Sequence, residues 1–292
     1  MKKLAIFVLI VFTTVPFVGY SQSFFAIRRD RNFLVSVGTG TATYKGEMVN
    51  PGDFGRLRPN VAIGAEYYMN SRLSVRAELT YFQLRGNDKD GDDDRWERNL
   101  SFKSGNVELS VMGAINLSPM GIRFYQRSAL NLHAFAGIGV LYFNPKADHP
   151  VTGKTYALAP LQTEGKKYSR IQPVIPLGIG ARIRLDPFFN ILVEGGYRFT
   201  FTDYLDDASS ERYPDPTKLK SELSRTFSDR RAEIGTKPDN YLVGKRGNPD
   251  DNDGYVILNV TLQYYLPKLV FSNYNKLYNI KRKGYYRKPR KS

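Results

Sequence analysis

The stretch from Asn190 to Asp203 reads NILVEGGYRFTFTD, and its alternation decides the fold class. The odd-numbered positions of this stretch are mostly apolar, whereas the even-numbered positions include Glu194 and Arg198. Successive side chains of a β-strand point to opposite faces, so a strand here has one apolar face and one charged face. A tilted strand needs about 9–11 residues to cross a bilayer. The stretch is therefore long enough to be a membrane-spanning β-strand with its apolar face towards lipid.

Seven other segments alternate in the same way, which gives eight predicted strands. The predicted strands are Phe33–Thr43, Asn60–Met69, Leu73–Arg85, Asn106–Leu117, Leu130–Phe143, Arg170–Leu185, Asn190–Asp203 and Tyr255–Leu266. The links after the second, fourth and sixth strands are brief (Asn70–Arg72, Ser118–Ala129 and Asp186–Phe189), and the other links are long and polar. Outer-membrane β-barrels have short periplasmic turns and long extracellular loops. We therefore predict an all-β fold, an eight-stranded antiparallel transmembrane β-barrel over residues 33–266.

The polar faces of the predicted strands carry both acidic and basic residues. These are Glu66, Arg76, Glu78, Glu108, Arg182, Arg184, Glu194 and Arg198. Unpaired charges inside a protein are costly, so we expect these side chains to pair with one another as a lumen charge network. An eight-stranded barrel is just wide enough for side chains to fill it, which argues against a conducting pore.

A soluble barrel of the lipocalin type, with the apolar face turned inward, is the alternative fold. Glycines such as Gly178 and Gly180 lie on the polar face, where a narrow and crowded lumen would need small residues. Aromatic residues such as Tyr81 and Tyr142 lie towards the ends of the apolar face, as in the interfacial girdles of membrane barrels. Both features favour the membrane barrel.

The first 21 residues have the pattern of a secretory signal peptide. Two lysines precede an apolar run up to Val18, and small residues lead to a predicted cleavage near Ser21 and Gln22. The apolar run is short for a permanent helical anchor. The absence of cysteine excludes both a lipid-anchored lipoprotein and a disulfide scaffold. We expect residues 22–32 to be a periplasmic lead-in to the barrel, and the protein to lie in the outer membrane.

Most of the formal net charge of +15 lies in the tail, residues 267–292. The tail contains nine Lys or Arg and neither Asp nor Glu. With an even number of strands, both chain ends are expected on the periplasmic side. Cations mixed with aromatic anchors are typical of docking surfaces, although a disordered solubilising tail is the alternative. The predicted docking residues are Lys281, Arg282, Lys283, Tyr285, Tyr286, Arg287 and Lys288. Because a secreted protein seldom meets nucleic acid, the expected partners are an acidic protein surface or lipid phosphates.

Catalytic and metal-binding patterns are weak in this chain. The Asp-rich stretches 87–94 and 250–254 lack the Gly and Glu spacing of an EF-hand, so they are interpreted as solvated turns, with incidental divalent-ion binding as the alternative. Of the two histidines, His133 is expected on the lumen face and His149 in the third outer loop. Neither has a nucleophile and an orienting group at a recognisable spacing. We predict a protein that is not an enzyme and that has no cofactor or metal site.

Four motifs, in order along the chain, resemble one known family. They are ATYKGE (residues 42–47), RNLSFKS (98–104), IQPVIPLGIG (171–180) and GGYRFTFTDYLDD (195–207). The chain resembles the PorG-like outer-membrane proteins of Bacteroidetes, components of the type IX secretion system and gliding machinery. The resemblance implies a structural role, in which the barrel links the outer membrane to a periplasmic ring formed by a lipoprotein and its partner.

Two functions from different classes follow from this sequence. In the first, the barrel is a non-enzymatic anchor that holds the periplasmic ring through its basic tail. In the second, it is a surface barrel whose outer loops bind a ligand, a glycan or a host protein. The long fourth loop, Leu205–Gly254, is large enough for the second function.

Overall fold

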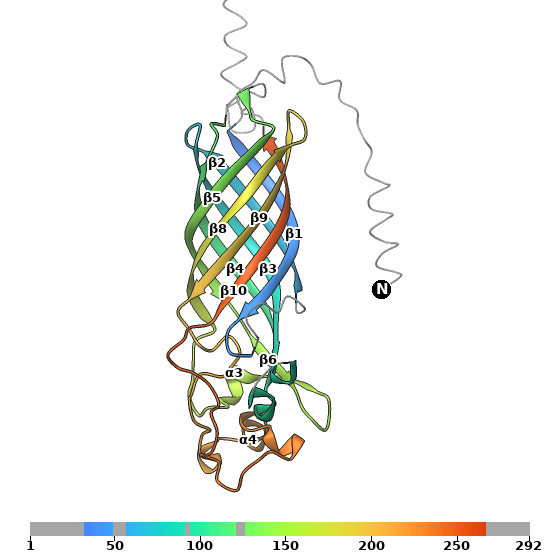
Figure 1. Ribbon diagram of the computed structural model, residues 1–292, viewed down its shortest axis with the longest axis vertical. Helices are drawn as coiled ribbons and strands as arrows, with labels where there is room; N and C mark the ends of the chain where they lie inside the picture. Colours follow the sequence, from blue (N-terminus) through green and yellow to red (C-terminus); the bar gives the residue numbers. More distant parts are fainter. Residues whose placement is uncertain (1–31, 49–56, 91–93, 121–125, 267–292) are drawn as a thin grey trace, which may run out of the picture.

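A computed structural model describes residues 32–48, 57–90, 94–120 and 126–266, and its main feature is a closed β-barrel (Figure 1). The barrel strands are β1 (Phe33–Lys45), β2 (Arg58–Tyr68), β3 (Leu73–Asn87), β4 (Ser101–Asn116), β5 (Leu130–Tyr142), β8 (Ile171–Arg184), β9 (Phe189–Thr200) and β10 (Gly254–Leu266). Each strand pairs in antiparallel fashion with its neighbour along the chain, and β1 closes the ring by pairing with β10. The predicted eight-stranded antiparallel barrel is confirmed.

The short turns at one end of the barrel have a simple chemical cause. The Asn70 side-chain oxygen accepts hydrogen bonds from the backbone N–H groups of Arg72 and Leu73, both at 2.8 Å. Asp186 does the same for Phe188 and Phe189, at 2.6 and 2.7 Å. Asn and Asp stabilise turns in this way because their side chains imitate a backbone acceptor. These turns lie at the end of the barrel where Phe33 pairs with Leu266, which is the upper end in Figure 1.

The barrel has its apolar face outward and its charged face inward. Ile138 and Ile179 on the outer face are 72% and 71% exposed, whereas Glu66 and Arg182 inside the barrel are 1% and 2% exposed. Such a belt of exposed Ile, Leu and Val side chains around a closed barrel is suited to lipid and not to water. The barrel is therefore membrane-spanning, and the lipocalin-like alternative, which has the opposite orientation, is wrong.

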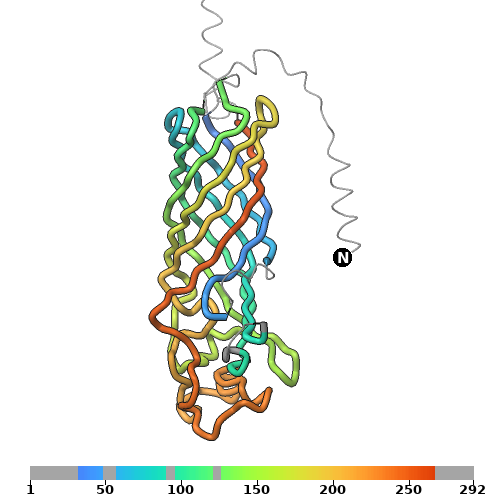
Figure 2. Tube along the Cα trace, in the orientation of Figure 1, coloured from blue at the N-terminus to red at the C-terminus, as the bar shows by residue number. Residues whose placement is uncertain are grey.

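The long connections at the other end of the barrel fold into a cap (Figures 1 and 2). The cap comprises β6 (Pro145–Asp148), β7 (Thr155–Ala157), α3 (Leu158–Leu161), α4 (Glu222–Ser228) and the 3₁₀ turns η1 (Asp88–Asp90), η2 (Asp94–Arg98), η4 (Pro216–Lys218) and η5 (Arg231–Ile234). None of the helices within the described ranges is both long and apolar enough to cross a membrane.

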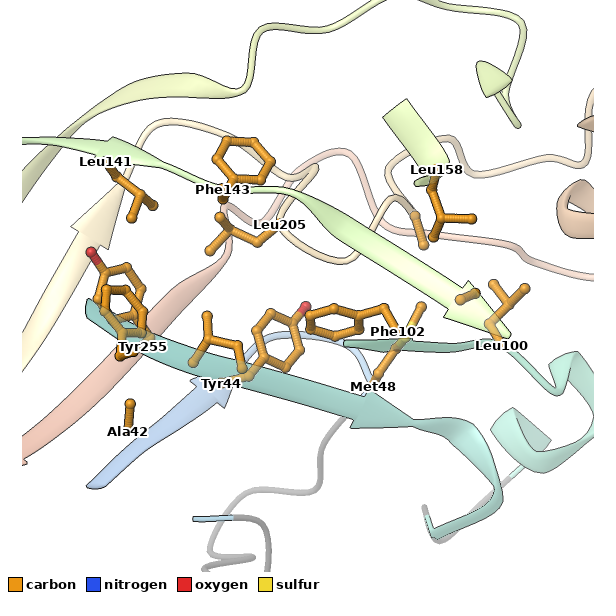
Figure 3. Close-up of a cluster of buried hydrophobic side chains, with 14 of the residues drawn as sticks. Ala42, Tyr44, Met48, Leu100, Phe102, Leu141, Phe143, Leu158, Leu205 and Tyr255 are labelled. Carbon is orange, nitrogen blue, oxygen red and sulfur yellow. The ribbon is translucent and has the colours of Figure 1, made fainter. Parts of the chain in front are cut away.

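A buried hydrophobic cluster joins the cap to the barrel mouth (Figure 3). It combines ends of barrel strands, such as Tyr44, Phe102 and Tyr255, with loop residues such as Leu158 and Leu205. Tyr44 meets Phe102 edge-on at 5.0 Å between ring centroids. Burial of this apolar surface stabilises the cap, so the loops that were predicted to be long and polar contain a hydrophobic core.

Five strands, β1 to β4 and β10, are longer at the cap end than the alternation predicts, and three of them illustrate the difference. β1 continues to Lys45, β3 continues to Asn87, and β4 begins at Ser101 and not at Asn106. The outward residues of these extensions, such as Asn87 and Lys103, are polar because they lie beyond the apolar belt. The lipid-facing periodicity therefore ends before the backbone pairing does.

Candidate functional site

The lumen next to the short turns is organised around Arg182 of β8. Its guanidinium donates to both carboxylate oxygens of Glu66 at 2.9 Å, to the Gln263 side chain at 3.0 Å and to that of Asn116 at 3.1 Å. Ser74 and Gln263 also donate to Glu66, at 2.6 and 2.8 Å. Five strands thus supply this fully buried ion pair and its hydrogen-bond partners.

A second group of charges occupies the middle of the lumen. Arg76 lies 2.9 Å from Glu194 and 3.7 Å from Glu78. His133 Nε2 lies 2.7 Å from the other oxygen of Glu194. Gly180 makes room for this group, because a Cβ at that position would lie 2.6 Å from the Glu194 side chain and 2.7 Å from the His133 ring. The sequence indicated that His133 faces the lumen, but its pairing with Glu194 was missed.

The third lumen group lies at the end of the barrel next to the cap. Arg198 approaches Glu108 at 3.6 Å, and the Tyr255 hydroxyl donates to Glu108 at 2.7 Å. Of the eight residues predicted to form the lumen charge network, the structure brings seven into these three groups. Arg184 lies apart from them, because it reaches the turn end and donates to the Arg127 carbonyl at 2.6 Å.

The turn end of the barrel has its own small apolar cluster. Met120, from the link between β4 and β5, packs with Leu34, Tyr68 and Tyr265. The Arg127 guanidinium stacks on the Tyr265 ring at 3.6 Å from its centroid. This end of the lumen is therefore filled by side chains. The tail residues predicted to dock a partner, Lys281, Arg282, Lys283, Tyr285, Tyr286, Arg287 and Lys288, lie outside the described residues, as does the predicted signal peptide.

Arg98 holds three outer segments together in the cap. Its guanidinium forms a bidentate ion pair with the Asp88 carboxylate, with both hydrogen bonds at 2.8 Å, and a single hydrogen bond to the Glu47 carboxylate at 3.0 Å. It also donates to the backbone carbonyl of Arg246 in the fourth loop. Asp88 was interpreted as part of a solvated turn, yet it is 1% exposed and it also accepts from the Leu100 N–H. Its role is structural.

Arg246 is the second buried arginine of the cap. Its guanidinium pairs with Glu164 of the third loop and donates to the carbonyls of Asp207 at 3.0 Å and Ser228 at 3.1 Å. Glu164 also accepts from the N–H groups of Ser209 and Ser210. Burial raises the pKa of Glu164, but the Arg246 charge and these hydrogen bonds lower it by more than burial raises it. The net shift of the pKa is therefore downward. This pair joins the third and fourth loops.

A group of buried acids lies where the fourth loop leaves and rejoins the barrel. The Tyr44 hydroxyl contacts Asp206 at 2.9 Å and also Asp253. A hydroxyl has one proton, so this arrangement requires one of the two carboxyl groups to be protonated. Burial raises the pKa of Asp206 to about 7, and burial together with the nearby Asp206 raises the pKa of Asp203 to about 8. At neutral pH, Asp203 is thus mostly protonated and Asp206 is partly protonated.

The buried acids predict a cap that loosens as pH rises. A carboxyl group with a raised native pKa stabilises the fold fully below its unfolded value near 4, and this contribution is lost as pH rises through the native value. Protection of the Leu205–Ala208 amides from hydrogen exchange, corrected for intrinsic rates, should therefore fall by about ten- to a hundredfold from pH 6 to pH 9. Amides of β9 serve as the internal control, and Asp203→Asn should reduce the change. Equal protection at both values would contradict this account.

Both histidines have structural environments. His133 is buried with Glu194 in the lumen, and His149 Nδ1 accepts from the backbone N–H groups of Val151 and Thr152 at the tip of the β6–β7 hairpin. In the described part of the chain, no group of three or more His, Asp or Glu residues is arranged to hold a metal ion. Asp253, predicted to lie in a solvated turn, is 2% exposed and accepts from the Leu205 N–H at 3.0 Å.

These features define a transmembrane β-barrel of the outer-membrane type, with a lumen filled by side chains and a folded cap at its outer end. The chain belongs to the family described as a domain of unknown function, DUF6089, which matches residues 23–222. No curated protein matches the chain.

Several solved outer-membrane structures are similar to this chain. One is the major outer membrane protein of Thermus thermophilus, with 15% sequence identity, 80% of this chain and 99% of that chain covered and a TM-score of 0.41. Another is Ail, the attachment invasion locus protein of Yersinia pestis, with 9% identity, 81% and 99% covered and a TM-score of 0.39. A third is Neisserial surface protein A, with 10% identity, 80% and 97% covered and a TM-score of 0.39.

Proposed function

We propose that the protein is a non-enzymatic outer-membrane component of a type IX protein secretion system, which anchors the periplasmic ring complex to the outer membrane. The proposal rests on the resemblance of its four motifs to the PorG-like proteins and on the basic tail. The ring proteins, a lipoprotein and its partner, are the proposed partners of the tail, and the barrel supplies the attachment to lipid.

One structural observation carries most of the argument. Leu266 pairs with Phe33 at the short-turn end of the barrel, so the chain leaves the last strand at that end. Short turns face the periplasm in this class of barrel. The filled lumen makes transport through the barrel a poor alternative. A barrel of this kind is suited to hold a partner protein at one of its faces, and Leu266, the residue before the tail, lies at the short-turn end.

Neutralising the tail tests the proposal. Lys281, Arg282, Lys283, Arg287 and Lys288 changed together to Gln should weaken capture of the ring proteins in a pull-down of the full-length protein. The wild-type capture should itself weaken with salt, because the screening length falls from about 8 Å at physiological ionic strength to about 3 Å at 1 M. Replacing Tyr285 and Tyr286 with Ala should weaken capture with little salt dependence, since aromatic anchors act by burial.

A matched control is available at the opposite end of the molecule. Five exposed cations of the cap can be changed to Gln without altering the tail: Lys166, Lys167, Lys218, Lys220 and Arg225. This control should capture the ring at the wild-type level. Wild-type capture by the neutralised tail would place the attachment elsewhere, with the Ser118–Ala129 link as the next segment to examine.

A hollow in the cap favours the second candidate function, ligand binding at the cell surface. Its volume is about 840 Å³, and its lining includes Arg98, Tyr213, Arg231 and Lys245. Small-molecule sites have volumes of about 300–1,000 Å³ and combine apolar surface with a few polar groups. If a surface ligand were the function, Tyr213→Ala and Lys245→Gln would impair it, whereas removal of residues 268–292 would not.

A further inference from the structure

Three cations form a row across the outer face of the sheet, next to the cap. Arg85 of β3 lies directly opposite Lys103 of β4, and Lys103 lies directly opposite Lys146 of β6. All three residues are exposed. Like charges in directly opposed positions destabilise a sheet. The arrangement is therefore unfavourable unless anions lie close to it.

The protein itself supplies one anion to this row. Lys103 Nζ contacts the two Asp148 oxygens at 2.7 and 2.9 Å. Within the described residues, Arg85 and Lys146 have no carboxylate partner. One acidic group thus faces three basic groups, and two positive charges remain uncompensated.

The row borders a hollow of about 530 Å³, which we name the cationic notch. Its lining includes Arg58, Tyr81, Arg85, Gly105 and Lys146. Gly105 lies beside the Tyr81 ring, and a Cβ there would be only 3.2 Å from the Tyr81 hydroxyl. The missing side chain therefore leaves space between the cationic row, on the cap side, and the Tyr81 ring, on the membrane side. The notch is large enough for a sugar phosphate.

The height of the notch matches the headgroup layer of the membrane. Tyr81 is 48% exposed and pairs with Val107, which in turn pairs with Tyr142. This row marks the outer edge of the apolar belt. Arg85 and Lys103 lie four residues beyond it, which is about 13 Å along the strand, or about 10 Å in height for a tilt near 40°. Lipid headgroups occupy the layer just outside the hydrocarbon core.

We propose that the cationic notch binds the phosphate-bearing headgroup of a glycolipid in the outer leaflet. Arg85 and Lys146 hold the phosphate oxygens, because two uncompensated cations at one edge of the hollow match a polyanionic group. Tyr81 lies against the sugar. The acyl chains run along the exposed Leu79 and Leu109, which lie on the membrane side of Tyr81. A lipid is favoured over a soluble phosphate because the apolar belt of the barrel begins directly at the membrane side of the notch.

Binding of lipid A to the full-length protein in a neutral detergent tests this proposal. Native mass spectrometry would compare diphosphorylated lipid A with the same lipid after phosphate removal. The diphosphorylated lipid should bind at least about tenfold more tightly. Changing Arg85, Lys103 and Lys146 together to Gln should abolish this preference. The control, Lys218, Lys220 and Arg225 changed to Gln, should keep it, since these cations lie in the cap loop away from the notch.

Asp148→Asn should change lipid binding in the opposite direction to the triple variant. Misfolding would weaken binding, so it cannot produce this result. Removing the acid that neutralises Lys103 should strengthen binding of the diphosphorylated lipid by several-fold. Inorganic pyrophosphate at the same phosphate concentration should compete weakly, because it has no acyl chains. Equal binding of both lipids, an unchanged triple variant, weaker binding by Asp148→Asn, or full competition by pyrophosphate would each overturn the proposal.

Discussion

Arg182→Met should lower the free energy of unfolding of the barrel by about 3–5 kcal/mol, the cost of removing one partner from a buried ion pair. The variant leaves Glu66, which is 1% exposed, without its two 2.9 Å contacts to the guanidinium. It also leaves the side chains of Gln263 and Asn116 without a donor. Urea unfolding in lipid vesicles, followed by circular dichroism of the strands, measures the loss.

Two further variants separate this effect from a general loss of packing. Arg184→Met lies two positions along the same strand, at the rim, where its guanidinium meets a backbone carbonyl. It should cost clearly less than Arg182→Met, because the Arg184 side chain is only partly buried and leaves no buried carboxylate stranded. Glu66→Gln added to Arg182→Met should recover much of the loss, because the stranded charge is removed. Equal unfolding midpoints for Arg182→Met and Arg184→Met would contradict a buried pair.

The barrel could be predicted because lipid imposes a rule on each residue in turn. Every second position from Ile191 to Phe199 must be compatible with the bilayer, and that requirement is visible in a single sequence. The same rule identified the inward charges but not their partners. Arg182 meets Glu66 from a position 116 residues away, and the pairing depends on the shear of the closed barrel.

The cap could not be predicted, because no periodicity governs it. The ion pair that joins its third and fourth loops links residues far apart in the sequence, Arg246 and Glu164, and the intervening loops have no repeating pattern. Asp88 and Asp253 looked like solvated turn residues because acidic residues usually are. Their burial depends on particular partners, Arg98 in the same loop as Asp88 and Tyr44 on β1 for Asp253, and no pattern in the sequence indicates these pairings.

Most of the motifs that carry the family resemblance contact one another in the structure. Tyr44 of the first motif contacts Asp206 of the fourth, and Arg98 of the second contacts Glu47 of the first. Three of the four motifs therefore meet at the outer mouth of the barrel, where they join the cap to the strands. Their immediate physical role is to hold the cap, and the proposed ring attachment depends on the opposite end of the molecule.

Arg246→Met should open the cap and leave the barrel intact. Arg246 is 1% exposed, and its removal strands the buried Glu164 carboxylate and the carbonyls of Asp207 and Ser228. Loss of one partner of such a pair costs about 3–5 kcal/mol. Each 1.4 kcal/mol is a factor of ten, so the open population of the cap should rise by about a hundred- to a few thousandfold.

Thermolysin measures this opening, because it cleaves next to apolar residues. Leu205, Leu219 and Phe227 are buried in the closed cap and become accessible only when it opens. When opening is rapid, the cleavage rate follows the open population, so cleavage at these three sites should accelerate by a similar factor, whereas cleavage at Leu242 and Val243, which are exposed in the closed cap, should not. Arg212→Met, at an exposed position in the same loop, should cleave at the wild-type rate. Circular dichroism of the strands should be unchanged in both variants, and adding Glu164→Gln to Arg246→Met should slow cleavage again. Cleavage of Arg246→Met at the rate of Arg212→Met would show that the apolar cluster alone holds the cap.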